Sequence, residues 1–429
     1  MTYNNPNING SNWSELNILE TLRKKNPLVI CITNDVVRTF TANGLLAIGA
    51  SPVMSECSED LKDLIVHASA LLINIGTVTP DKVTYYKEAV KLAKAHEVPI
   101  GLDPVGCHAG AYRLSVVLDL IKTNAISLLR GNQSEIKAIY DALNTNHKVN
   151  NSLSGKGVDG EQVEDSAIIT YRLARQINCP VVATGEEDYV SDGTRVFAVP
   201  HGHPIMTVVT GTGCLLGAVL AAFFSSYCPF MYNMSIGEFL AYALAYYGLA
   251  GESAVKVSGV KPGSFSVAFM DALYEFDDAM LLSGNRIRPV VVPDQLKVYF
   301  ISGTQDVGFN ESHLLDIVEA ACRGGVTCFQ FREKGIGTLE GQQKLELAQQ
   351  LKEICAMYNV LYIINDDVDL AVAVNADGVH VGQEDMRLED VRNLVGNKVV
   401  GISIHSVEEL HKTDVVYADC VGVGPMYAT

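Results

Sequence analysis

The chain repeats one pattern, in which short apolar runs alternate with longer amphipathic stretches. In its first part these runs lie at 27–32, 70–76, 98–104 and 180–185. This alternation is typical of a parallel sheet with helices on its faces. Such sheets bind ligands beyond the carboxyl ends of their strands. Four polar residues fall at those ends: Asn34, Asn74, Asp103 and Thr184.

The pattern lapses at 284–297, where two prolines interrupt a stretch without helical period, and this indicates a domain boundary. Shorter units then follow, with apolar runs at 298–302, 327–332, 361–365, 377–381, 398–403 and 419–424. They read as βα units of a TIM-type barrel. Only six of the eight strands of a (β/α)8 barrel are found before Thr429, so we expect an incomplete barrel or a fragment.

Composition supports two domains, because 429 residues with 48% hydrophobic and 19% charged content exceed one ordinary core. We expect a disordered tail at 1–12, a first domain at 13–285, a linker at 286–297 and a second domain at 298–429. The net charge of -17 gives no electrostatic footprint for nucleic acid or an anionic membrane, so the partners are expected to be small molecules.

Cysteine usage and the N-terminus favour a cytoplasmic protein. Ten cysteines occur without a CxxC pair, and the polar N-terminus has neither the basic nor the apolar region of a signal peptide. The uncharged segment 211–236 approaches the length of a membrane span, but Pro229, Asn233 and two serines interrupt it. We therefore expect a buried helix there.

The sequence VTGTGC at 209–214 predicts a glycine turn that opens a helix. Gly211 and Gly213 let backbone N–H groups gather around an anion, and the helix N-terminus adds partial positive charge, so we expect a phosphate there. Cys214 would lie beside the transferring phosphoryl group, with its pKa lowered toward thiolate, and could act as a base. The alternative is a tight turn into a buried helix.

Two acidic motifs are candidates for Mg²⁺ binding. In RGNQSEI at 130–136, Asn132 and Glu135 are three residues apart and share one face of a helical turn, with oxygens that suit Mg²⁺. The alternative is a capping arrangement at a helix start. Asp103 in LDPVG is a second candidate for metal or phosphate positioning, and its alternative is a turn-forming Asp-Pro pair.

Together, these motifs resemble those of hydroxyethylthiazole kinase, a member of the ribokinase-like superfamily. The matching segments, in family order, are PLVICITNDVVRTFTANGLLAIGASPVM at 27–54, LLINIGT at 71–77, LDPVG at 102–106, RGNQSEI, KGVD at 156–159, TGEEDYVSDG at 184–193 and VTGTGC. The resemblance spans roughly 13–285. It implies a ribokinase-like α/β/α sandwich that transfers the ATP γ-phosphate to the alcohol of 4-methyl-5-(2-hydroxyethyl)thiazole.

The resemblance also implies residue roles. Met54 and Gly211 would contact the thiazole alcohol, and Arg130 and Thr184 would contact ATP. Asp103 and Glu135 would bind or position Mg²⁺. Cys214 occupies the position at which sugar kinases of the superfamily carry a catalytic Asp, where a weak base can suffice.

Some histidines and cysteines of the first domain have simpler explanations. Cys107 and His108 depart from the family pattern after LDPVG, and we interpret the pair as structural because it lacks further ligands. His201 and His203 are loop residues, or contact substrate because they are close to VTGTGC.

The second domain has its own phosphate and metal candidates. In QFREK at 330–334, Gln330, Arg332 and Lys334 alternate at a strand end and would form a basic binding site for a phosphorylated ligand. The alternative is that these side chains form a solvated charged face. Asp366 and Asp385 follow successive strand units, where they would bind a hard cation at the barrel mouth.

QFREK, IINDD at 363–367, ADGVHVGQED at 376–385, GIS at 401–403 and VGVGPMYAT at 421–429 resemble thiamine phosphate synthase. That family joins hydroxymethylpyrimidine diphosphate to thiazole phosphate and releases pyrophosphate. The resemblance implies that Gln330, Arg332, Lys334 and Asn365 hold the pyrimidine diphosphate, Asp366 and Asp385 the Mg²⁺, and Ser403 the reacting groups. The last two βα units, whose loops often bind phosphate, are absent, so we expect no synthase activity.

The sequence thus predicts a thiamine-pathway enzyme in which a kinase domain is fused to a partial synthase domain. The kinase resemblance further suggests a homo-oligomer, and specifically a trimer. The alternative is a ribokinase-like kinase of another alcohol, such as hydroxymethylpyrimidine, with a second domain that binds or assembles without catalysis. ASPVM at 50–54 and Cys214 argue against the other alcohol.

Overall fold

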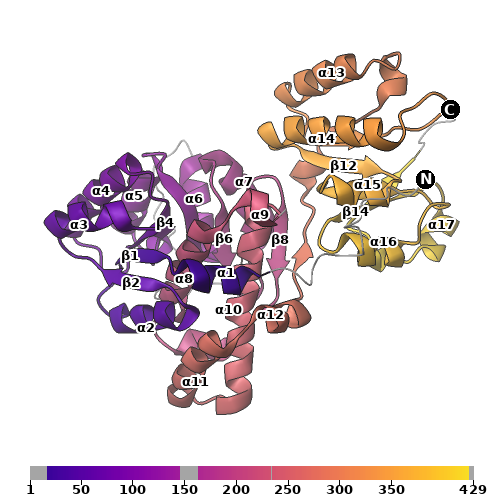
Figure 1. The fold of residues 1–429 in the computed structure, drawn as a ribbon. Coiled ribbons are helices and arrows are strands. Elements are labelled where there is room, and N and C mark those ends of the chain that lie inside the picture. Colours follow the sequence, from indigo (N-terminus) through magenta and orange to yellow (C-terminus); the bar gives the residue numbers. More distant parts are fainter. Residues whose placement is uncertain (1–16, 145–162, 233, 425–429) are drawn as a thin grey trace. The chain divides into compact units, whose positions relative to one another are not determined.

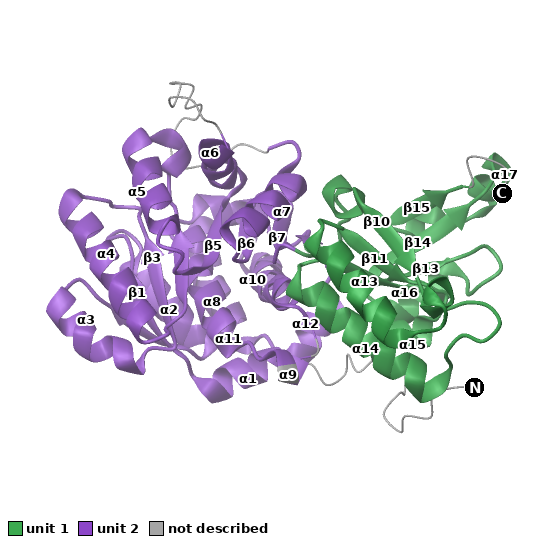
Figure 2. Ribbon diagram, turned by 90° about the horizontal axis from the view of Figure 1, so that it is seen from above, with its two compact units in different colours: residues 1–13, 194–196, 288–429 green, residues 14–193, 197–287 purple. Residues whose placement is uncertain are grey.

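The computed structural model describes residues 17–144, 163–232 and 234–424. These residues form two compact units (Figure 2). The first holds residues 197–287 and the described residues before 194, and the second holds 194–196 and the described residues from 288 onward. The division after residue 287 falls inside the segment 286–297. The tail at 1–12 and the KGVD motif lie outside the described residues.

The first unit is built on a mixed sheet with the strand order β2-β1-β3-β4-β5-β6-β7-β8. Neighbouring strands from β2 to β6 pair in parallel, as the alternating sequence pattern predicts. β7 pairs antiparallel with β6, because the connection of residues 185–187 is too short for a crossover. The strands are β1 (Leu28–Ile32), β2 (Ser51–Met54), β3 (Ala70–Asn74), β4 (Ile100–Asp103), β5 (Ile126–Asn132), β6 (Val181–Thr184), β7 (Asp188–Ser191) and β8 (Val196–Val199).

Helices cover both faces of this sheet, so the unit has the three layers of the predicted α/β/α sandwich (Figure 1). One face packs against α3 (Ser58–Leu64), α4 (Pro80–Ala95), α5 (Ala111–Ile121), α6 (Gln133–Asn144) and α7 (Ser166–Ile177). The other layer contains α1 (Ile18–Lys25), α2 (Arg38–Ile48), α8 (Thr212–Ser226), α9 (Pro229–Tyr232), α10 (Ile236–Ser258), α11 (Pro262–Glu275) and α12 (Asp278–Gly284).

Helix α8 forms from the uncharged segment and is buried along nearly its whole length. It contacts β3 and β4 on one side and α2 and α10 on the other. A Cβ atom on Gly101 would lie 3.5 Å from the Ala221 side chain, which shows how closely the helix approaches the sheet. The expectation of a buried helix is confirmed. Within the described part of the chain, no helix combines the length and apolarity needed to cross a membrane.

The second unit contains six parallel strands in the order of the sequence, as the βα pattern predicts. They are β10 (Tyr299–Ser302), β11 (Cys328–Phe331), β12 (Leu361–Asn365), β13 (Gly378–Val381), β14 (Val399–Ile404) and β15 (Cys420–Val423), preceded by the short β9 (Arg288–Pro289). The connecting helices are α13 (Glu311–Arg323), α14 (Gly341–Met357), α15 (Val368–Ala373), α16 (Leu388–Val395) and α17 (Val407–Lys412).

The two faces of this second sheet differ. One face packs against α13 to α16 in a large apolar core, while the other carries a small cluster around Cys328, Leu361, Ile363 and Val399. This is the arrangement of a half-barrel, with helices outside and strand side chains inside. In the described sheet, β10 and β15 are the edge strands.

Candidate active sites

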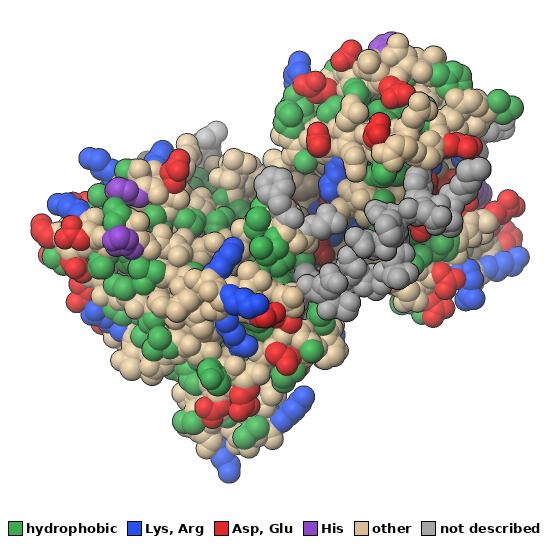
Figure 3. Space-filling model, in the orientation of Figure 1, with side chains coloured by type: hydrophobic (Ala, Val, Ile, Leu, Met, Phe, Trp, Pro, Cys, Tyr) green, Lys and Arg blue, Asp and Glu red, His purple; other side chains and the backbone are tan. Residues whose placement is uncertain are grey.

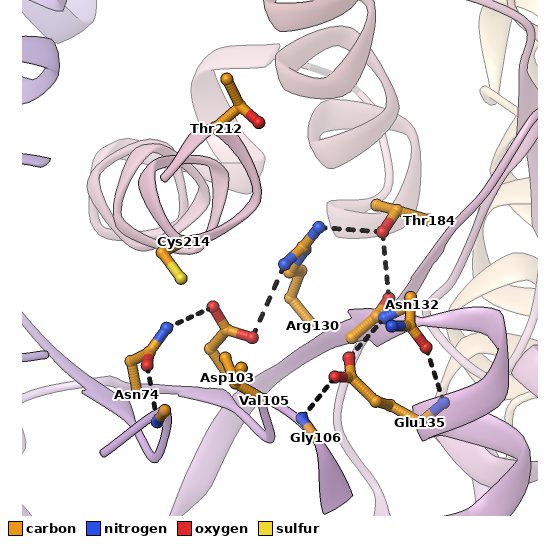
Figure 4. A network of polar contacts seen from close by, with 12 residues as sticks. Asn74, Asp103, Val105, Gly106, Arg130, Asn132, Glu135, Thr184, Thr212 and Cys214 are labelled. Carbon is orange, nitrogen blue, oxygen red and sulfur yellow. Dashed lines mark hydrogen bonds and ion pairs between the residues drawn. The ribbon is translucent and has the colours of Figure 1, made fainter. Parts of the chain in front are cut away.

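The carboxyl ends of neighbouring strands in the first unit carry a connected network of polar side chains (Figure 4). Asn74, Asp103 and Thr184 are the last residues of β3, β4 and β6. Arg130 lies on β5, which is between β4 and β6 in the sheet. The structure therefore brings together residues that the sequence placed at strand ends.

Asp103 has no exposed surface. Its Oδ2 accepts a hydrogen bond of 2.7 Å from Asn74 Nδ2, and its Oδ1 lies 3.6 Å from Arg130 Nη1. Among the described residues, Oδ1 has no hydrogen-bond partner. Burial raises the pKa of Asp103 to about 6, and Arg130 and the bond from Asn74 oppose that rise.

Arg130 extends this network to the start of α8. Its Nη2 donates a 2.9 Å hydrogen bond to Thr184 Oγ1. A Cβ atom on Gly213 would lie 3.5 Å from both terminal nitrogens of the guanidinium group, so the cation lies against the first turn of the helix. The first N–H groups of a helix have no intrahelical partner and attract anions. A guanidinium group and a helix N-terminus thus converge where a phosphate is expected.

The VTGTGC turn adopts the geometry predicted from its glycines. Gly211 is the N-cap of α8 with φ of 99°, a left-handed conformation that favours glycine. A Cβ atom there would lie 3.1 Å from the Phe40 ring. Thr212 Oγ1 donates to the Met206 carbonyl at 2.6 Å and fixes the incoming chain. The prediction of a glycine turn opening a helix is confirmed.

Cys214 lies in the first turn of α8, and in Figure 4 its sulfur points toward Asn74 and Asp103. The expectation of a lowered thiol pKa is wrong. Burial, together with the nearby Asp103 carboxylate, raises the pKa of Cys214 to about 11. Arg130 and the hydrogen bond from Asn34 lower the pKa but do not outweigh the loss of hydration, so the sulfur is a thiol at neutral pH.

Asn132 and Glu135 form a reciprocal capping arrangement. Glu135 N donates to Asn132 Oδ1 at 2.8 Å, and Asn132 N donates to Glu135 Oε2 at 2.7 Å. Glu135 Oε1 accepts a further bond of 2.7 Å from Gly106 N. The capping alternative therefore describes the geometry, while a metal role for these residues stays a prediction. Burial and the neighbouring Asp103 raise the pKa of Glu135 to about 7.

Met54 ends β2, at the same edge of the sheet as the network but on its outermost strand. Cys107 is buried and donates to the Glu135 carbonyl. His108 is 4% exposed, and within residues 17–144, 163–232 and 234–424 neither of its ring nitrogens is hydrogen-bonded. Neither residue belongs to a metal-binding group, because the described residues contain no cluster of three or more His, Cys, Asp or Glu side chains suited to a metal.

His201 and His203 make structural contacts. The Nε2 atom of His201 accepts from Arg286 N at 2.9 Å, and its Nδ1 lies 3.3 Å from Glu252 Oε1. His203 Nδ1 accepts from Ile205 N at 3.2 Å, at the start of a 3-10 helix over Pro204–Val208. Both histidines hold the chain that leads into the VTGTGC turn.

In the second unit, three of the predicted residues come together beyond the strand ends. Lys334 Nζ donates to Asp366 Oδ2 at 2.7 Å. Burial raises the pKa of Asp366, and the nearby Asp385 carboxylate adds to that rise. Asp385 Oδ2 accepts from Gly382 N at 2.7 Å. This cluster has the opposed charges expected for binding a metal and a diphosphate.

The remaining predicted residues lie along the strands of the half-barrel. Gln330 on β11 is 3% exposed, and its Nε2 has no hydrogen-bond partner among the residues that the structure describes. β11 ends at Phe331, so Arg332 and Lys334 lie in the following loop, where strand alternation no longer determines their direction. Asn365 ends β12 and faces His380 in the strand register. Ser403 Oγ lies 2.8 Å from His380 Nε2.

Sequence reasoning missed His380 and Asn34 as site residues. His380 lies on β13 within the quoted segment ADGVHVGQED, two residues from the strand start, where a polar residue in an apolar run is the available signal. Asn34 lies just after β1 and contacts both Asn74 and Cys214. It was recognised as a strand-end residue, but nothing in the sequence indicates its partners.

Comparison with known proteins matches each unit to a family. Residues 19–279 match the hydroxyethylthiazole kinase family, and residues 298–429 match thiamine monophosphate synthase. A hydroxyethylthiazole kinase of Streptococcus agalactiae is 48% identical over 265 residues, which cover 62% of this chain and 98% of that protein. The solved structure of a hydroxyethylthiazole kinase protein from Pyrococcus horikoshii is 35% identical, with a TM-score of 0.56, and covers 64% of this chain and 98% of that one.

A match that extends across both units is to the thiamine biosynthesis bifunctional protein ThiM/ThiE of Symbiobacterium thermophilum, which is 35% identical over 419 residues. The match covers 96% of this chain and 82% of that protein. The order of the two units along the chain is therefore shared with a two-domain relative.

Proposed function

Because the chain belongs to the hydroxyethylthiazole kinase family and carries a thiamine monophosphate synthase domain after it, we propose that it catalyses the phosphorylation step of thiamine biosynthesis that precedes the synthase reaction. The first unit transfers the γ-phosphate of ATP to the primary alcohol of 4-methyl-5-(2-hydroxyethyl)thiazole. The second unit is the domain that would consume the phosphorylated product.

The observation that carries the kinase proposal is the convergence of the Arg130 guanidinium group on the start of α8. Phosphoryl transfer depends mainly on positioning and charge stabilisation. Arg130 and the free N–H groups at Gly213 would hold the phosphate oxygens, while Thr184 fixes the guanidinium orientation. Met54 and Gly211, at the same edge, would contact the thiazole alcohol.

Cys214 would orient the attacking alcohol. Since its pKa is about 11, it acts as a neutral thiol or a very weak base rather than a preformed thiolate. A loose transition state makes little demand on the base, because proton removal lags behind cleavage of the phosphate bond. The catalytic contribution of Cys214 is therefore expected to lie mainly in alcohol placement.

The residues present fit a Mg²⁺ ion that is carried with ATP. Mg²⁺ commonly uses one or two carboxylates together with phosphates and waters. The buried Asp103 Oδ1 has no hydrogen-bond partner in the described part of the chain. Asp103 would contact the ion, and Asn132 and Glu135 would act through water because their side chains already hold backbone groups. When bound, the ion neutralises charge on the transferring phosphoryl group.

An ATP-consumption assay with purified protein tests this assignment. We expect turnover with hydroxyethylthiazole and Mg-ATP. Turnover with hydroxymethylpyrimidine and none with hydroxyethylthiazole would favour the alternative kinase and overturn the substrate assignment.

For the second unit we propose binding of hydroxymethylpyrimidine diphosphate through Gln330, Arg332, Lys334 and Asn365, with Asp366 and Asp385 holding Mg²⁺ and Ser403 near the reacting groups. The Lys334, Asp366 and Asp385 cluster supports this set. The described sheet has two open edges, whereas a closed barrel has none. We therefore expect the 429-residue chain to bind the diphosphate without forming thiamine phosphate, and detection of that product would contradict this.

We also propose a cytoplasmic homo-oligomer, specifically a trimer formed through the first unit. Exposed apolar side chains lie on neighbouring elements there, including Val36, Leu46, Val208 and Val267. None of the ten cysteines forms a disulfide. On the face shown in Figure 3, Lys and Arg side chains lie beside Asp and Glu. The net charge of -17 supports small-molecule partners rather than nucleic acid. Light scattering on the purified protein measures the oligomeric state.

A further inference from the structure

Asn34 connects the Cys214 thiol to the buried Asp103 carboxylate through a chain of two amides. Asn34 Nδ2 lies 3.2 Å from Cys214 Sγ and 3.1 Å from Asn74 Oδ1. Asn74 Nδ2 in turn donates to Asp103 Oδ2 at 2.7 Å. Asn34 is 6% exposed and Asn74 is fully buried, so both amides have little access to water.

The direction of the bonds in this chain follows from one group that cannot change its role. The Gly76 N–H can only donate, and it lies 2.9 Å from Asn74 Oδ1, which must therefore be the amide oxygen. The Asn74 nitrogen then faces the Asp103 carboxylate. Asn34 must present its NH₂ group to Asn74 Oδ1, and the second hydrogen of the same NH₂ group points to Cys214 Sγ.

The surrounding backbone makes room for this arrangement. A Cβ atom on residue 76 would lie 2.8 Å from both Cβ and Nδ2 of Asn34, so glycine at this position leaves space for the amide. This arrangement also determines the direction of the thiol hydrogen. Because Cys214 Sγ accepts a hydrogen bond from Asn34 through one lone pair, the S–H group must point away from Asn34.

We propose that Asn34 is a positioning residue, which fixes Cys214 with its sulfur as acceptor and leaves the S–H group directed toward the attacking alcohol. This inference rests on the proposed kinase function. Asn34 acts through Cys214 and Asn74 holds Asn34 in the required orientation. The role differs from that of a residue that merely fills space, because it requires a donor at this position.

A double-mutant cycle tests the proposal on the full chain with hydroxyethylthiazole and Mg-ATP. We expect Asn34→Ala to lower kcat about 3- to 10-fold, the worth of one hydrogen bond, with the KM for ATP unchanged. In a Cys214→Ala background the same substitution should lower kcat less than about 2-fold, because its target is gone. An equal loss in both backgrounds would assign Asn34 a structural role and overturn the proposal.

Asn34→Asp provides a nearly isosteric second variant, which remains informative if Asn34→Ala does not fold. It places an acceptor opposite both Asn74 Oδ1 and Cys214 Sγ, so we expect a larger loss of kcat than with alanine. Retention of full activity would overturn the proposed orientation. Asn144→Ala, which removes an exposed amide of α6, is the matched control and should leave kcat unchanged.

Failure of this inference is distinguishable from failure of the proposed function. If the unmodified protein phosphorylates a different alcohol, the substrate assignment fails, and the cycle can be measured with that alcohol instead. If hydroxyethylthiazole is phosphorylated and the two substitutions are additive, only the role of Asn34 is lost.

Discussion

Substitution of Glu135 by glutamine tests whether this side chain holds the loop as well as serving a metal. Its two carboxylate oxygens accept bonds from Gly106 N and Asn132 N, both at 2.7 Å, and the residue is 2% exposed. Glutamine has the same shape but only one acceptor oxygen. Its NH₂ group would therefore face one of the two backbone N–H groups, and that N–H group would lose its hydrogen bond.

The expected cost follows from those contacts. Losing a hydrogen bond to a charged acceptor costs about 1.5–3 kcal/mol, and leaving a buried N–H unsatisfied costs about 1–3 kcal/mol. Because the pKa of Glu135 is about 7, the carboxylate is only partly ionised at neutral pH, which reduces the first contribution. We expect a loss of about 2–3 kcal/mol, which lowers Tm by roughly 4–12 °C at about 2–4 °C per kcal/mol.

Thermal and urea unfolding of the full chain, followed by circular dichroism, measure this change. Glu88→Gln is the matched control, because Glu88 is partly exposed and lies 3.8 Å from Lys62, so its loss should change stability by less than about 0.5 kcal/mol. An unchanged Tm for Glu135→Gln, together with a higher Mg²⁺ requirement, would refute the capping argument and leave a purely metal-related role.

Three further predictions concern the same unit. Cys214→Ala should lower kcat by about 10²-fold or more with little change in the KM for ATP, while Cys214→Asp should retain activity; steady-state kinetics measure both. The kcat should fall as pH drops through about 6, because protonated Asp103 loses its charge toward Mg²⁺, and a pH–rate profile without that decline would contradict this. Burial lowers the pKa of His201 in the folded state, so on acidification the imidazole is protonated first in the unfolded chain. The free energy of unfolding should therefore decrease below about pH 6.5. His201→Gln should reduce this pH dependence in urea titrations.

The sequence predicted the strand ends well because polar residues directly after apolar runs mark them. Asp103 and Thr184 were placed in this way, and both lie in the network. The βα rhythm predicted six parallel strands in the second unit for the same reason. The antiparallel β7 was not predicted, because its apolar run differs little from that of a parallel strand and only the short connection after Thr184 sets its direction.

The electrostatics of the site were harder to predict. The position of Cys214 at a helix start suggested a thiolate, but the pKa depends on how much water and which charges surround the sulfur in three dimensions. Glu135 shows the same limit. Its spacing from Asn132 is compatible with metal binding or with a helix cap. Only the third contact, from Gly106 N in a loop distant in sequence, shows that its carboxylate stabilises the local fold.

Helix α8 has a consequence for how the first unit unfolds. Apolar side chains surround this helix on all sides, and it contacts the sheet as well as α2 and α10. Such a helix presents little surface to water, so neither layer can separate from it without exposing a continuous apolar surface. The sheet and its second helical layer should therefore melt in one cooperative transition, and the helix that opens at the phosphate site should show the slowest amide exchange in the unit.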